Sequence, residues 1–480
     1  MTPSQRSTPS SPNSPADGAS GAATVRTPDY ERAVATLERA LAFGIHPSLD
    51  GITELCEALG RPQDRFASIQ VTGTNGKTST VRMLAALLAA HGLRAGLYTS
   101  PHLERYPERI EVDGAPVSDE AFGARVSEVL AVAESLRGAT ATGSPEGFTE
   151  FELLTAAALY AFAAAGVDVA VLEVGMGGRW DATSVVAPRV SVVTGVGLDH
   201  TAVLGETLAE IAAEKAAIIR EGSIAVTGPG CAPVLDVIAA RARDCNAELR
   251  TVAEAGTPGS GGALVVFSVS GRPSGPLGST NLHVTGAEAE YPALEIAAPA
   301  YQAANVATAI AAAEACLSEA LDIAATRKAL TGLTLPGRFE VVSREPLVVV
   351  DGSHNPQAAA VLADAIEDAW PVPTRRPTVL LGVLADKDAA GIVEALAPVA
   401  GDFAVTSPDS PRALEAERLA SVVESVAGVI PLVFESISAA LTALVGSCPH
   451  GLLVTGSLTT AGQARTSLRR RATTDVVEAE

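Results

Sequence analysis

The stretch V-T-G-T-N-G-K-T-S-T, residues 71–80, decides the fold of this chain. A strand-like run, 68–71, leads into it, and a helical pattern, 81–90, leads out of it. Strand, glycine turn, lysine, hydroxyl and helix together form the layout of a phosphate-binding loop. Glycines let backbone N–H groups approach phosphate oxygens, and the N-terminus of the helix adds its positive end. The stretch therefore predicts a nucleotide-binding loop within an α/β fold.

The polar residues of this loop have separate roles in such a site. Lys77 would reach the terminal phosphates of the nucleotide, and Thr78 or Ser79 would ligate magnesium. The spacing departs from the common G-x-x-x-x-G-K-[ST] pattern, because Val71 stands where the first glycine would be. A short Gly-Lys string also occurs in plain strand-to-helix turns. The flanking strand and helix favour the nucleotide site over that simpler interpretation.

Length and composition indicate a globular protein of two or three domains. The 480 residues are 47% hydrophobic and 19% charged. The net charge of −21 argues against a general nucleic-acid or acidic-membrane surface. An anionic substrate would therefore need a local pocket of arginine, lysine and magnesium. No apolar stretch resembles a signal peptide or a membrane span.

The cysteines indicate the compartment in which the protein works, and the lysines indicate candidate functional residues. Five cysteines are scattered without C-x-x-C pairing, which favours reduced thiols in a cytoplasm over a disulfide framework or a zinc site. Only four lysines occur, against 30 arginines. Three of them, Lys77, Lys215 and Lys387, lie in motifs that also contain glycine, acidic or histidine residues. A chain so poor in lysine has little reason to keep one where arginine would serve, so these positions suggest chemistry.

Hydrophobic periodicity predicts a first α/β unit over 29–334. Residues 1–28 lack large apolar side chains, and we expect a disordered tail there, with a second short tail at 473–480. A β-rich stretch, 251–298, reads as a small antiparallel insertion or flap. Helices are expected at 29–42, 48–60, 118–136 (with a Ser118 cap), 150–165, 207–219, 301–316 and 323–330, and buried strands at 94–98, 167–174 and 189–196.

A second unit, 335–472, follows a hinge at 335–339. Its strands alternate with helical stretches, which is typical of a mainly parallel sheet. The expected strands are 347–350, 378–383, 403–406, 429–434 and 451–454.

Three residues beyond the loop are candidates for its chemistry. Glu173 ends a buried strand, where folds of this kind hold magnesium, and it precedes a glycine cluster at 175–178. Glycine clusters at strand ends mark close ligand approach, which favours a ligand over a solvated carboxylate. His200 ends the next strand and is a candidate metal ligand, although a lone histidine is more often structural. Lys215, on the following helix, would by default be an unpaired surface lysine.

These residues carry a resemblance to a known family. The chain resembles folylpolyglutamate synthase/dihydrofolate synthase of the actinobacterial type, within the Mur-type ATP-dependent amide ligases. Any one string is weak, but the ordered set over roughly residues 30–470 is specific. The matching strings are G-T-N-G-K-T-S-T at 73–80, T-S-P-H-L at 99–103, E-R-I at 108–110, F-E-L-L-T at 151–155, L-E-V-G-M-G-G-R-W-D-A-T at 172–183, L-D-H at 198–200, E-K-A at 214–216, P-G-R-F-E at 336–340, D-G-S-H-N-P at 351–356, D-K-D at 386–388 and P-R-A-L at 411–414.

The resemblance implies a fold and a set of site residues. The fold would be a P-loop-containing Mur-ligase central domain with a mostly parallel sheet, followed by a C-terminal Rossmann-like α/β domain. ATP would contact Thr74, Asn75, Gly76, Lys77, Thr78, Ser79, Asn305, Arg338 and Asp351. Magnesium, as two ions, would be held by Ser100, Glu173 and His200. The pterin part of folate would lie against Thr149, Phe151, Trp180, Asp181 and Ala182.

Two further implications concern catalysis. The lysine that matches Lys215 is often carbamylated in this family, which gives a carboxylate-like group beside the second magnesium. A carbamate forms only on a neutral amine, so the pKa of Lys215 would have to be depressed. His354, with Asp351, lies on the loop that brings the second domain to the reaction, so the implied catalytic set is Lys77, Lys215, His200 and His354.

The implied reaction joins L-glutamate to a carboxylate. ATP would phosphorylate the carboxylate of a folate or of dihydropteroate, and the glutamate amine would then displace phosphate from the acyl phosphate. The protein would supply positioning and charge neutralisation, and its domains would close to exclude water. We expect a monomer that binds neither nucleic acid nor membrane.

The chain departs from the family at three positions. Ser184 stands where the family usually has asparagine, Ala217 where it has glycine, and Ser353 where it has alanine. None of these removes a ligand, but Ser184 is a candidate for altered substrate preference.

Three other functions fit the sequence less well. Another Mur-type ligase, acting on a cell-wall nucleotide precursor, agrees poorly with the F-E-x-x-T and G-G-R-W-D-A-T strings. A nucleotide switch or kinase-like protein would need a guanine-reading N-K-x-D, and only D-K-D at 386–388 is present. A non-catalytic relic is disfavoured because every expected metal position is filled.

Overall fold

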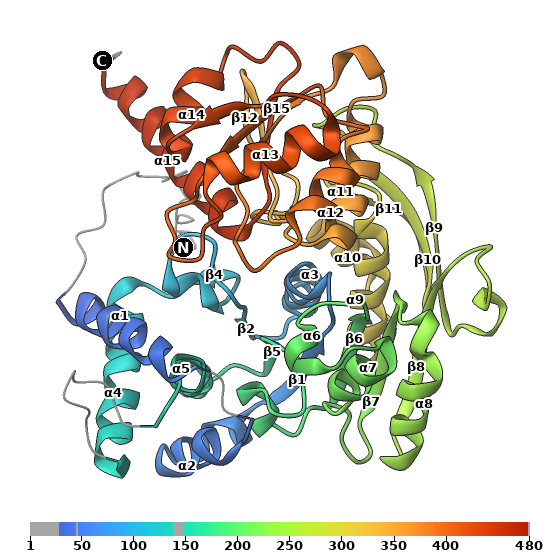
Figure 1. Ribbon diagram of the computed structural model, residues 1–480. Helices are drawn as coiled ribbons and strands as arrows, with labels where there is room; N and C mark the ends of the chain where they lie inside the picture. Colours follow the sequence, from blue (N-terminus) through green and yellow to red (C-terminus); the bar gives the residue numbers. More distant parts are fainter. Residues whose placement is uncertain (1–27, 45–46, 138–146, 479–480) are drawn as a thin grey trace, which may run out of the picture.

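Two β-sheets, each flanked by helices, make up the protein (Figure 1). The computed structural model describes residues 28–44, 47–137 and 147–478. Of the predicted N-terminal tail, 1–28, residues 1–27 lie outside the described residues, and Pro28 begins a helix. The first sheet has the strand order β11-β10-β9-β8-β7-β6-β1-β5-β2-β3-β4, and the second has the order β12-β13-β17-β14-β15-β16. The α/β class predicted from the sequence is confirmed, while the predicted domain limits at 29–334 and 335–472 stay a prediction.

The first sheet is parallel in its centre and antiparallel at both edges. Its strands are β1 (Ala67–Thr72), β2 (Ala95–Tyr98), β3 (Ile110–Val112), β4 (Ala115–Pro116), β5 (Val169–Glu173), β6 (Val190–Gly195), β7 (Ile224–Gly230), β8 (Glu248–Glu254), β9 (Val265–Gly271), β10 (Thr280–Thr285) and β11 (Glu290–Ile296). Its helices are α1 (Pro28–Ala40), α2 (Asp50–Ala58), α3 (Lys77–Ala90), α4 (Asp119–Arg137), α5 (Glu150–Ala165), α6 (Thr201–Leu204), α7 (Leu208–Ala216), α8 (Leu235–Asp244), α9 (Gln302–Leu317) and α10 (Ile323–Thr331).

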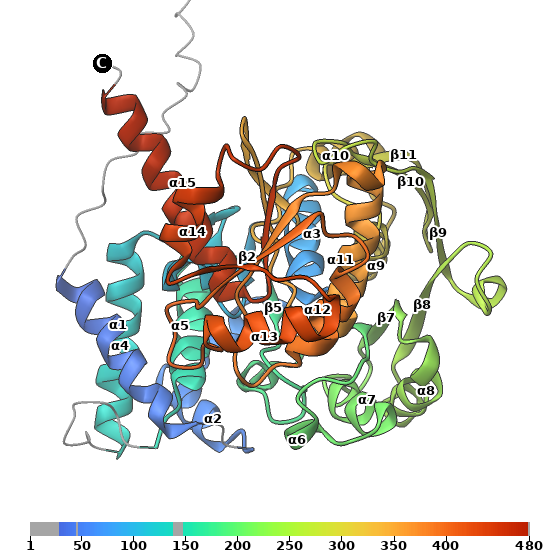
Figure 2. The ribbon, with the colours of Figure 1, turned by 45° about the horizontal axis from the view of Figure 1, so that its top comes forward.

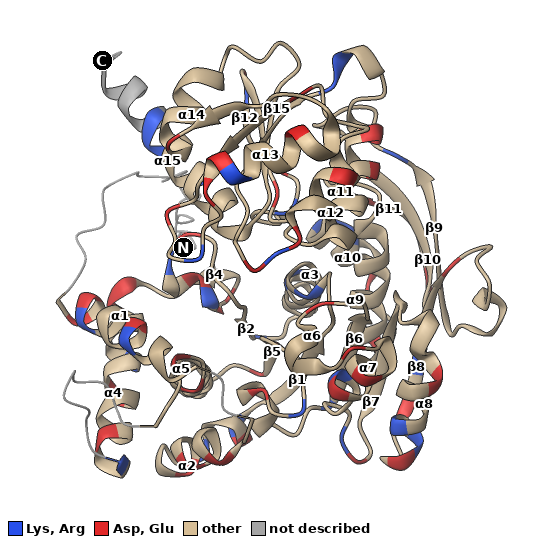
Figure 3. Ribbon diagram, in the orientation of Figure 1, with Lys and Arg blue, Asp and Glu red and all other residues tan. Residues whose placement is uncertain are grey.

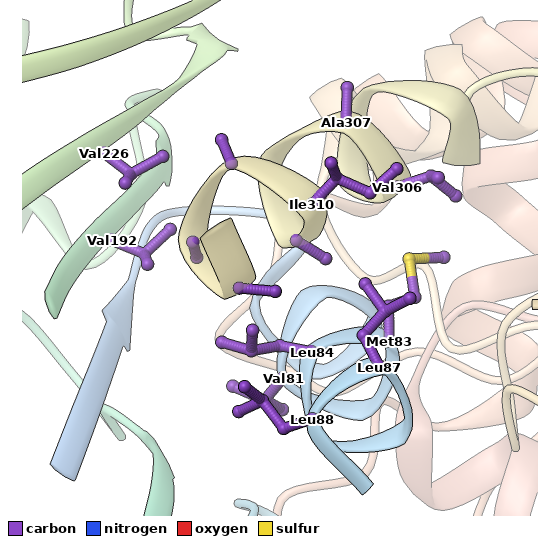
Figure 4. Packing of buried hydrophobic residues seen from close by; sticks show 14 of the residues in the cluster. Val81, Met83, Leu84, Leu87, Leu88, Val192, Val226, Val306, Ala307 and Ile310 are labelled. Carbon is purple, nitrogen blue, oxygen red and sulfur yellow. The ribbon is translucent and has the colours of Figure 1, made fainter. Parts of the chain in front are cut away.

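The phosphate-loop helix α3 is buried on one face of this sheet. Its apolar side chains, among them Leu84 and Leu87, pack with Ile310 of α9 and with Val192 of β6 (Figure 4). Burial of several such side chains stabilises the fold by about 1.5–3 kcal/mol each. Because β1 and α3 are both fixed in this core, the loop between them is held at a defined place on the sheet edge.

The opposite face is covered by two helix groups. Helices α1, α2, α4 and α5 form one cluster with β2 and β5, and α7 and α8 form another with β6 and β7. The predicted Ser118 cap is present, because the Ser118 hydroxyl accepts the backbone N–H of Ala121 at 3.1 Å. Helix α5 is closed by a capping box between Thr149 and Glu152, and it begins and ends where the pattern predicted. These helices leave the carboxyl ends of β1, β5 and β6 open.

The stretch 251–298, predicted as a small antiparallel insertion or flap, extends the first sheet, and that it is an insertion stays a prediction. The stretch is β-rich, but β8 pairs in parallel with β7, and β9 pairs in parallel with β8. The antiparallel strands β10 and β11 then continue the same sheet. In Figures 1 and 2 this edge lies on the side of the molecule opposite α1 and α4. Glycine and proline in the connecting loops give the sequence its insertion-like appearance. Buried and exposed residues alternate along these strands, and β9 and β10 pack against α9, whereas β11 packs against α10.

The second sheet is parallel except for its first strand. Its strands are β12 (Glu340–Arg344), β13 (Leu347–Val350), β14 (Thr378–Leu381), β15 (Asp402–Thr406), β16 (Leu432–Phe434) and β17 (Leu452–Thr455), and its helices are α11 (Pro356–Ala369), α12 (Ala389–Leu396), α13 (Ala416–Ala427), α14 (Ile437–Leu444) and α15 (Leu458–Glu478). The predicted strands are confirmed, although β16 is shorter than 429–434. The hairpin strand β12 was missed. Helix α15 continues to Glu478, so the tail expected at 473–480 is helical as far as that residue.

No helix in the described part of the chain combines the length and apolar character needed to cross a membrane.

Candidate active site

Two adjoining cavities lie at the carboxyl edge of the first sheet. The first, of about 600 Å³, is bounded by the phosphate loop on one side and by the second sheet on the other. The second, of about 710 Å³, lies between the start of α5 and the Gly175–Asp181 loop. The residues shared by both walls are Gly175, Met176, Gly177 and Leu204. A molecule with an anionic end and an aromatic end could therefore extend across both.

The phosphate loop is folded tightly around its own lysine. The Lys77 ammonium donates to the backbone carbonyls of Gly73 and Thr74 at 2.9 and 3.3 Å. Burial lowers the pKa of Lys77, although nearby Glu173 opposes that shift. Gly76 has φ of 85°, and an added Cβ would lie 2.6 Å from an Asn305 side-chain oxygen. Only glycine fits there, and the backbone N–H groups at the start of α3 face the cavity.

Glu173 ends β5 beside this loop and is 1% exposed. Its carboxylate accepts the Thr78 hydroxyl at 2.8 Å and the Ser100 backbone N–H at 3.3 Å. Burial raises the pKa of Glu173, whereas Lys77 and Thr78 lower it. The Ser100 hydroxyl oxygen is buried and has no hydrogen-bond partner. An unpartnered hydroxyl beside a buried carboxylate is a fitting pair of oxygen ligands for Mg²⁺.

His200 and Lys215 line the same cavity. His200 precedes α6 with φ of 52°, and its side chain is 47% exposed. Among the described residues, no three His, Cys, Asp or Glu side chains form a ready metal cluster, so phosphate or water oxygens would have to complete any magnesium shell. Lys215 is 4% exposed, which contradicts the default interpretation of a surface lysine. Burial, with the neighbouring Lys77 charge, lowers the pKa of Lys215 to about 7.

The remaining predicted nucleotide residues approach from α9 and from the second sheet. Asn305, Arg338, Asp351 and His354 all line the first cavity, as do Thr74, Asn75 and Ser79 of the loop. The Arg338 guanidinium lies 3.4 Å from the Thr78 hydroxyl. Asp351 accepts the backbone N–H of Phe339 at 2.8 Å, and so braces the hinge rather than pointing freely into the cavity. The structure thus brings together every residue predicted for ATP, magnesium and catalysis.

The second cavity has a different character. All five residues predicted for the pterin, Thr149, Phe151, Trp180, Asp181 and Ala182, line it. Its charged wall residues are all acidic: Glu152, Asp181, Glu210 and Glu214. Asp181 is 7% exposed, and burial raises its pKa, whereas hydrogen bonds from Thr183 and from backbone N–H groups lower it. An apolar, aromatic pocket with carboxylates suits a flat heterocycle that donates hydrogen bonds.

Ser184 lines neither of the two cavities, and its effect on substrate preference stays a prediction. Its buried hydroxyl donates to the Gly178 carbonyl at 2.6 Å and accepts from the Gln70 amide at 2.8 Å. It therefore supports the glycine loop from behind. Ala217 directly follows the last residue of α7 and is buried, and the Ser353 hydroxyl donates to the Asp351 carboxylate at 2.5 Å.

Sequence reasoning gave no role to several residues on the side of the second sheet. Lys387 lies 3.6 Å from Asp199, and Gln357 accepts from the Asn75 amide at 3.1 Å. Arg412 and the start of α15 complete this wall. The D-K-D and P-R-A-L strings were visible in the sequence, and Arg412 of the second pairs with Asp386 of the first. The contact of Lys387 with Asp199, by contrast, joins the two sheets, and only the fold brings these residues together.

Comparisons with known proteins agree with this arrangement. Residues 337–458 match the Mur ligase, glutamate ligase domain. The dihydrofolate synthase/folylpolyglutamate synthase of Mycobacterium tuberculosis is 36% identical over 481 residues, covering 93% of this chain and 96% of that protein.

Solved structures give the same result. The Mycobacterium tuberculosis folylpolyglutamate synthase complexed with ADP has a TM-score of 0.82 and 36% identity, and the match covers 92% of this chain and 98% of that one. The Escherichia coli FolC in complex with DHPP and ADP has a TM-score of 0.78 and 30% identity, with 92% and 98% covered. With these relatives matched over nearly their whole length, this chain belongs to the dihydrofolate synthase/folylpolyglutamate synthase family of Mur-type ligases.

Proposed function

We propose that this protein is an ATP-dependent ligase that adds L-glutamate to the carboxylate of a folate, and also to dihydropteroate, through an acyl phosphate. The observation that carries the proposal is the contrast between the two adjoining cavities. One holds a phosphate loop with Lys77, Lys215 and Arg338, whereas the other is aromatic and acidic. The pterin part of a folate, with its amino and ring N–H groups, suits the acidic cavity, and the carboxylate at the other end of the folate would reach toward the phosphates.

The same contrast disfavours a cell-wall nucleotide precursor as acceptor. Such a precursor carries a diphosphate, which would be repelled by Glu152, Asp181, Glu210 and Glu214. The ligands of a relative agree with this choice, since the Escherichia coli protein was solved with DHPP and ADP.

In this proposal the phosphate loop neutralises ATP. The backbone N–H groups at the start of α3 and the Lys77 ammonium hold the phosphates in line with the acceptor carboxylate. Arg338 reaches the same place from the hinge. The acceptor carboxylate attacks the γ-phosphorus, ADP departs, and the neutral amine of glutamate then displaces phosphate from the acyl carbon. Enclosure between the two sheets keeps water from the acyl phosphate.

Ser100, Glu173 and His200 are proposed to hold Mg²⁺, with a second ion near Lys215. Magnesium in such sites offsets the charge that develops on the transferred phosphoryl group. The buried, unpartnered Ser100 hydroxyl and the buried Glu173 carboxylate fit this role. The depressed pKa of Lys215 would supply the neutral amine that a carbamate needs.

The wall formed by the second sheet is proposed to hold glutamate. Lys387 and Arg412 offer cations for its two carboxylates, and both line the first cavity opposite the phosphate loop. His354 donates from Nδ1 to the Gly352 carbonyl at 2.9 Å, and burial lowers its pKa. Its other ring nitrogen is then an acceptor that can take a proton from the incoming amine.

The test is to offer dihydropteroate and a reduced folate separately, each with ATP, Mg²⁺ and L-glutamate. Mass spectrometry should detect each acceptor with one glutamate added, and ADP should form in equal amount. A UDP-linked muramyl acceptor should give no product. Glutamate addition to the muramyl acceptor but to neither pterin would reject the proposal. We further propose a cytoplasmic monomer, to be checked by fractionation and light scattering.

A further inference from the structure

A buried arginine joins the two sheets at the seam between them. Arg465 of α15 is 9% exposed. Its Nε atom donates to a carboxylate oxygen of Glu340 at 2.9 Å, and Nη1 pairs with Glu104. Glu340 is the first residue of β12, in the second sheet, whereas Glu104 belongs to the loop after β2, in the first sheet. One guanidinium therefore fixes a loop of one sheet against the hinge strand of the other.

The Glu104 side of this network is held by backbone hydrogen bonds. The Glu108 carboxylate accepts three consecutive backbone N–H groups, from Leu103, Glu104 and Arg105, at 3.0, 3.2 and 2.9 Å. Leu103 packs against the hydrophobic cluster of the second sheet. The same loop begins with Ser100, the candidate magnesium ligand. A loop that carries a site residue is thus seated in the opposite half of the molecule.

The Glu340 side leads to the nucleotide cavity. The second Glu340 oxygen accepts the backbone N–H of Gly337 at 2.8 Å. Gly337 has φ of 64°, and its carbonyl accepts Nη1 of Arg338 at 3.1 Å. The other terminal nitrogen of Arg338 lies 3.4 Å from the Thr78 hydroxyl. A continuous set of contacts therefore runs from Arg465 through Glu340 and the hinge to Arg338.

The charges explain why this set needs arginine. Glu104 and Glu340 have side chains only 10% and 18% exposed, and both pair with the buried Arg465 guanidinium. Glu104 is also bonded by the exposed Arg469 at 2.9 Å and by the Thr466 hydroxyl at 2.6 Å, whereas Glu340 is paired with Arg465. Lysine at this position would keep the charge, but its single nitrogen cannot occupy the two separate positions from which Nε and Nη1 of the guanidinium reach the two carboxylates. If the Arg465 guanidinium no longer bonds Glu340, the Glu340 carboxylate can move away from the Gly337 N–H. The hinge then loses the hydrogen bond that holds it to β12.

We propose that Arg465 is a positioning residue for ATP: by holding Glu340 against the hinge, it sets where the Arg338 guanidinium meets the phosphates. This inference rests on the proposed function, because that function assigns Arg338 to the nucleotide. Arg465 itself lies outside the residues that line the cavity. Its effect should therefore pass through Arg338 and not through direct contact with ATP.

A double-mutant cycle tests the proposal. The dissociation constant of a non-hydrolysable ATP analogue with Mg²⁺ is measured by calorimetry for Arg465→Lys, Arg338→Ala and the double variant. We expect Arg465→Lys to weaken binding about 10-fold, on the scale of a misplaced binding group. In the Arg338→Ala background the same change should weaken binding by less than about 2-fold. Unchanged affinity in Arg465→Lys, or an equal loss in both backgrounds, would overturn the proposal.

Two further variants keep the result interpretable. Glu340→Gln is nearly isosteric and should repeat the Arg338-dependent loss, so it answers the question if Arg465→Lys does not fold. Arg272→Ala is the matched control, because Arg272 pairs with Asp368 at 3.0 Å and joins the β9 edge to α11 across the same seam. It should leave analogue binding unchanged, and an equal loss there would point to general loosening and reject the proposal. Absence of analogue binding by the wild-type protein would instead reject the proposed function.

Discussion

At the scale of single residues, Lys77 allows the most direct test of the proposed function. Lys77→Ala should lower kcat by at least about 100-fold, which is the scale of lost electrostatic stabilisation in a transition state. The fold should survive, because the lysine contacts only backbone carbonyls of its own loop and lies at the cavity wall. The measurement is ATP-dependent glutamate addition, with circular dichroism as the fold control. Near-normal turnover by a folded Lys77→Ala protein would contradict the role.

Lys215 should behave differently from an ion-pairing lysine. Arginine keeps the positive charge but cannot form a carbamate, so Lys215→Arg should lose at least about 100-fold in kcat if a carboxylate is needed there. Lys215→Glu would supply a shorter carboxylate and restore part of the activity. Both variants are assayed with and without bicarbonate, beside acetate as a small carboxylic acid. Full activity in Lys215→Arg would exclude the carbamate, and rescue by acetate in Lys77→Ala would show that the effect is not specific.

The depressed pKa of Lys215 also predicts how stability depends on pH. The unfolded chain binds this proton up to its ordinary value of 10.5, whereas the native chain releases it near 7. Between these values the unfolded state holds more protons, so the free energy of unfolding rises with pH, by up to about 1.4 kcal/mol per unit. Below pH 7 the native protein carries the buried Lys215 charge, and the whole destabilisation that this charge causes is present.

Denaturant unfolding at pH 7, 8 and 9, in CO₂-free buffer, checks this dependence. The difference between wild type and Lys215→Met should grow in favour of wild type as the pH rises. Parallel pH curves for the two proteins would show that Lys215 keeps its proton throughout.

These residues also show where sequence reasoning succeeds. The positions of Lys77 and Glu173 follow from local pattern, because one begins a helix after a glycine turn and the other ends an apolar strand. The burial of Lys215 does not follow from its helix, where one turn of sequence cannot distinguish a surface lysine from one facing a cavity. The contact between Asp199 and Lys387 depends on how two sheets meet, and local pattern carries no information about that.

At the scale of elements, the Gly175–Asp181 loop separates the two cavities and is fixed by close packing. A Cβ on Gly178 would lie 2.8 Å from the Glu214 carbonyl and 2.9 Å from the Lys215 carbonyl. Gly178→Ala should therefore push the loop from α7 and destabilise the protein by about 1–3 kcal/mol, the usual cost of overpacking.

The variant should also lower kcat/KM for the pterin, because the loop lines its proposed pocket. Gly332→Ala is the matched control, since its Cβ would meet only the Lys328 carbonyl at an ordinary 3.5 Å. Melting curves and steady-state kinetics of both variants measure the change in stability and in kcat/KM. Equal behaviour of the two would mean that the loop adjusts without cost.

The positions of helices and strands could be predicted where neighbouring residues determine them. The pairing of strands that are distant in the sequence could not be predicted. The Ser118 cap of α4 was visible in the sequence and is observed. The starts predicted for α5 and α7, at residues 150 and 207, agree with the observed Glu150 and Leu208. The run 251–298 has strand-like alternation, but its sequence cannot say that β8 joins β7 in parallel instead of forming a separate flap. The edge strand β16 is shortened to three residues because Val429 to Pro431 lie outside the sheet pairing. Exposed apolar residues there imitate a longer strand.

At the scale of the whole molecule, the proposed function requires a strongly acidic protein to bind substrates that carry phosphates and carboxylates. Asp and Glu positions are spread over the outer helices of both sheets, such as α1, α8 and α11 (Figure 3). In the cavity between the sheets the basic residues outnumber the acidic ones, since it is lined by Lys77, Lys215, Arg338, Lys387 and Arg412 and by Glu173, Asp199 and Asp351. The net charge of −21 therefore says little about the substrate, whose charge is read locally.

We expect the first sheet to bind the nucleotide and the second sheet to bind glutamate, and substitution of Lys387 tests this division. Its amine lies 3.6 Å from Asp199, across the cavity from the phosphate loop, and its side chain is 13% exposed. If it binds a glutamate carboxylate, Lys387→Met removes a charged hydrogen bond of about 1.5–3 kcal/mol and should raise KM for glutamate about 10- to 100-fold. The dissociation constant for ADP should change less than about 2-fold, because nucleotide contacts come from the loop, α9 and the hinge. Lys328→Met, at an exposed position of α10, is the matched control and should alter neither value. Equal losses for glutamate and ADP would instead mean that Lys387 acts by holding the two sheets together through Asp199.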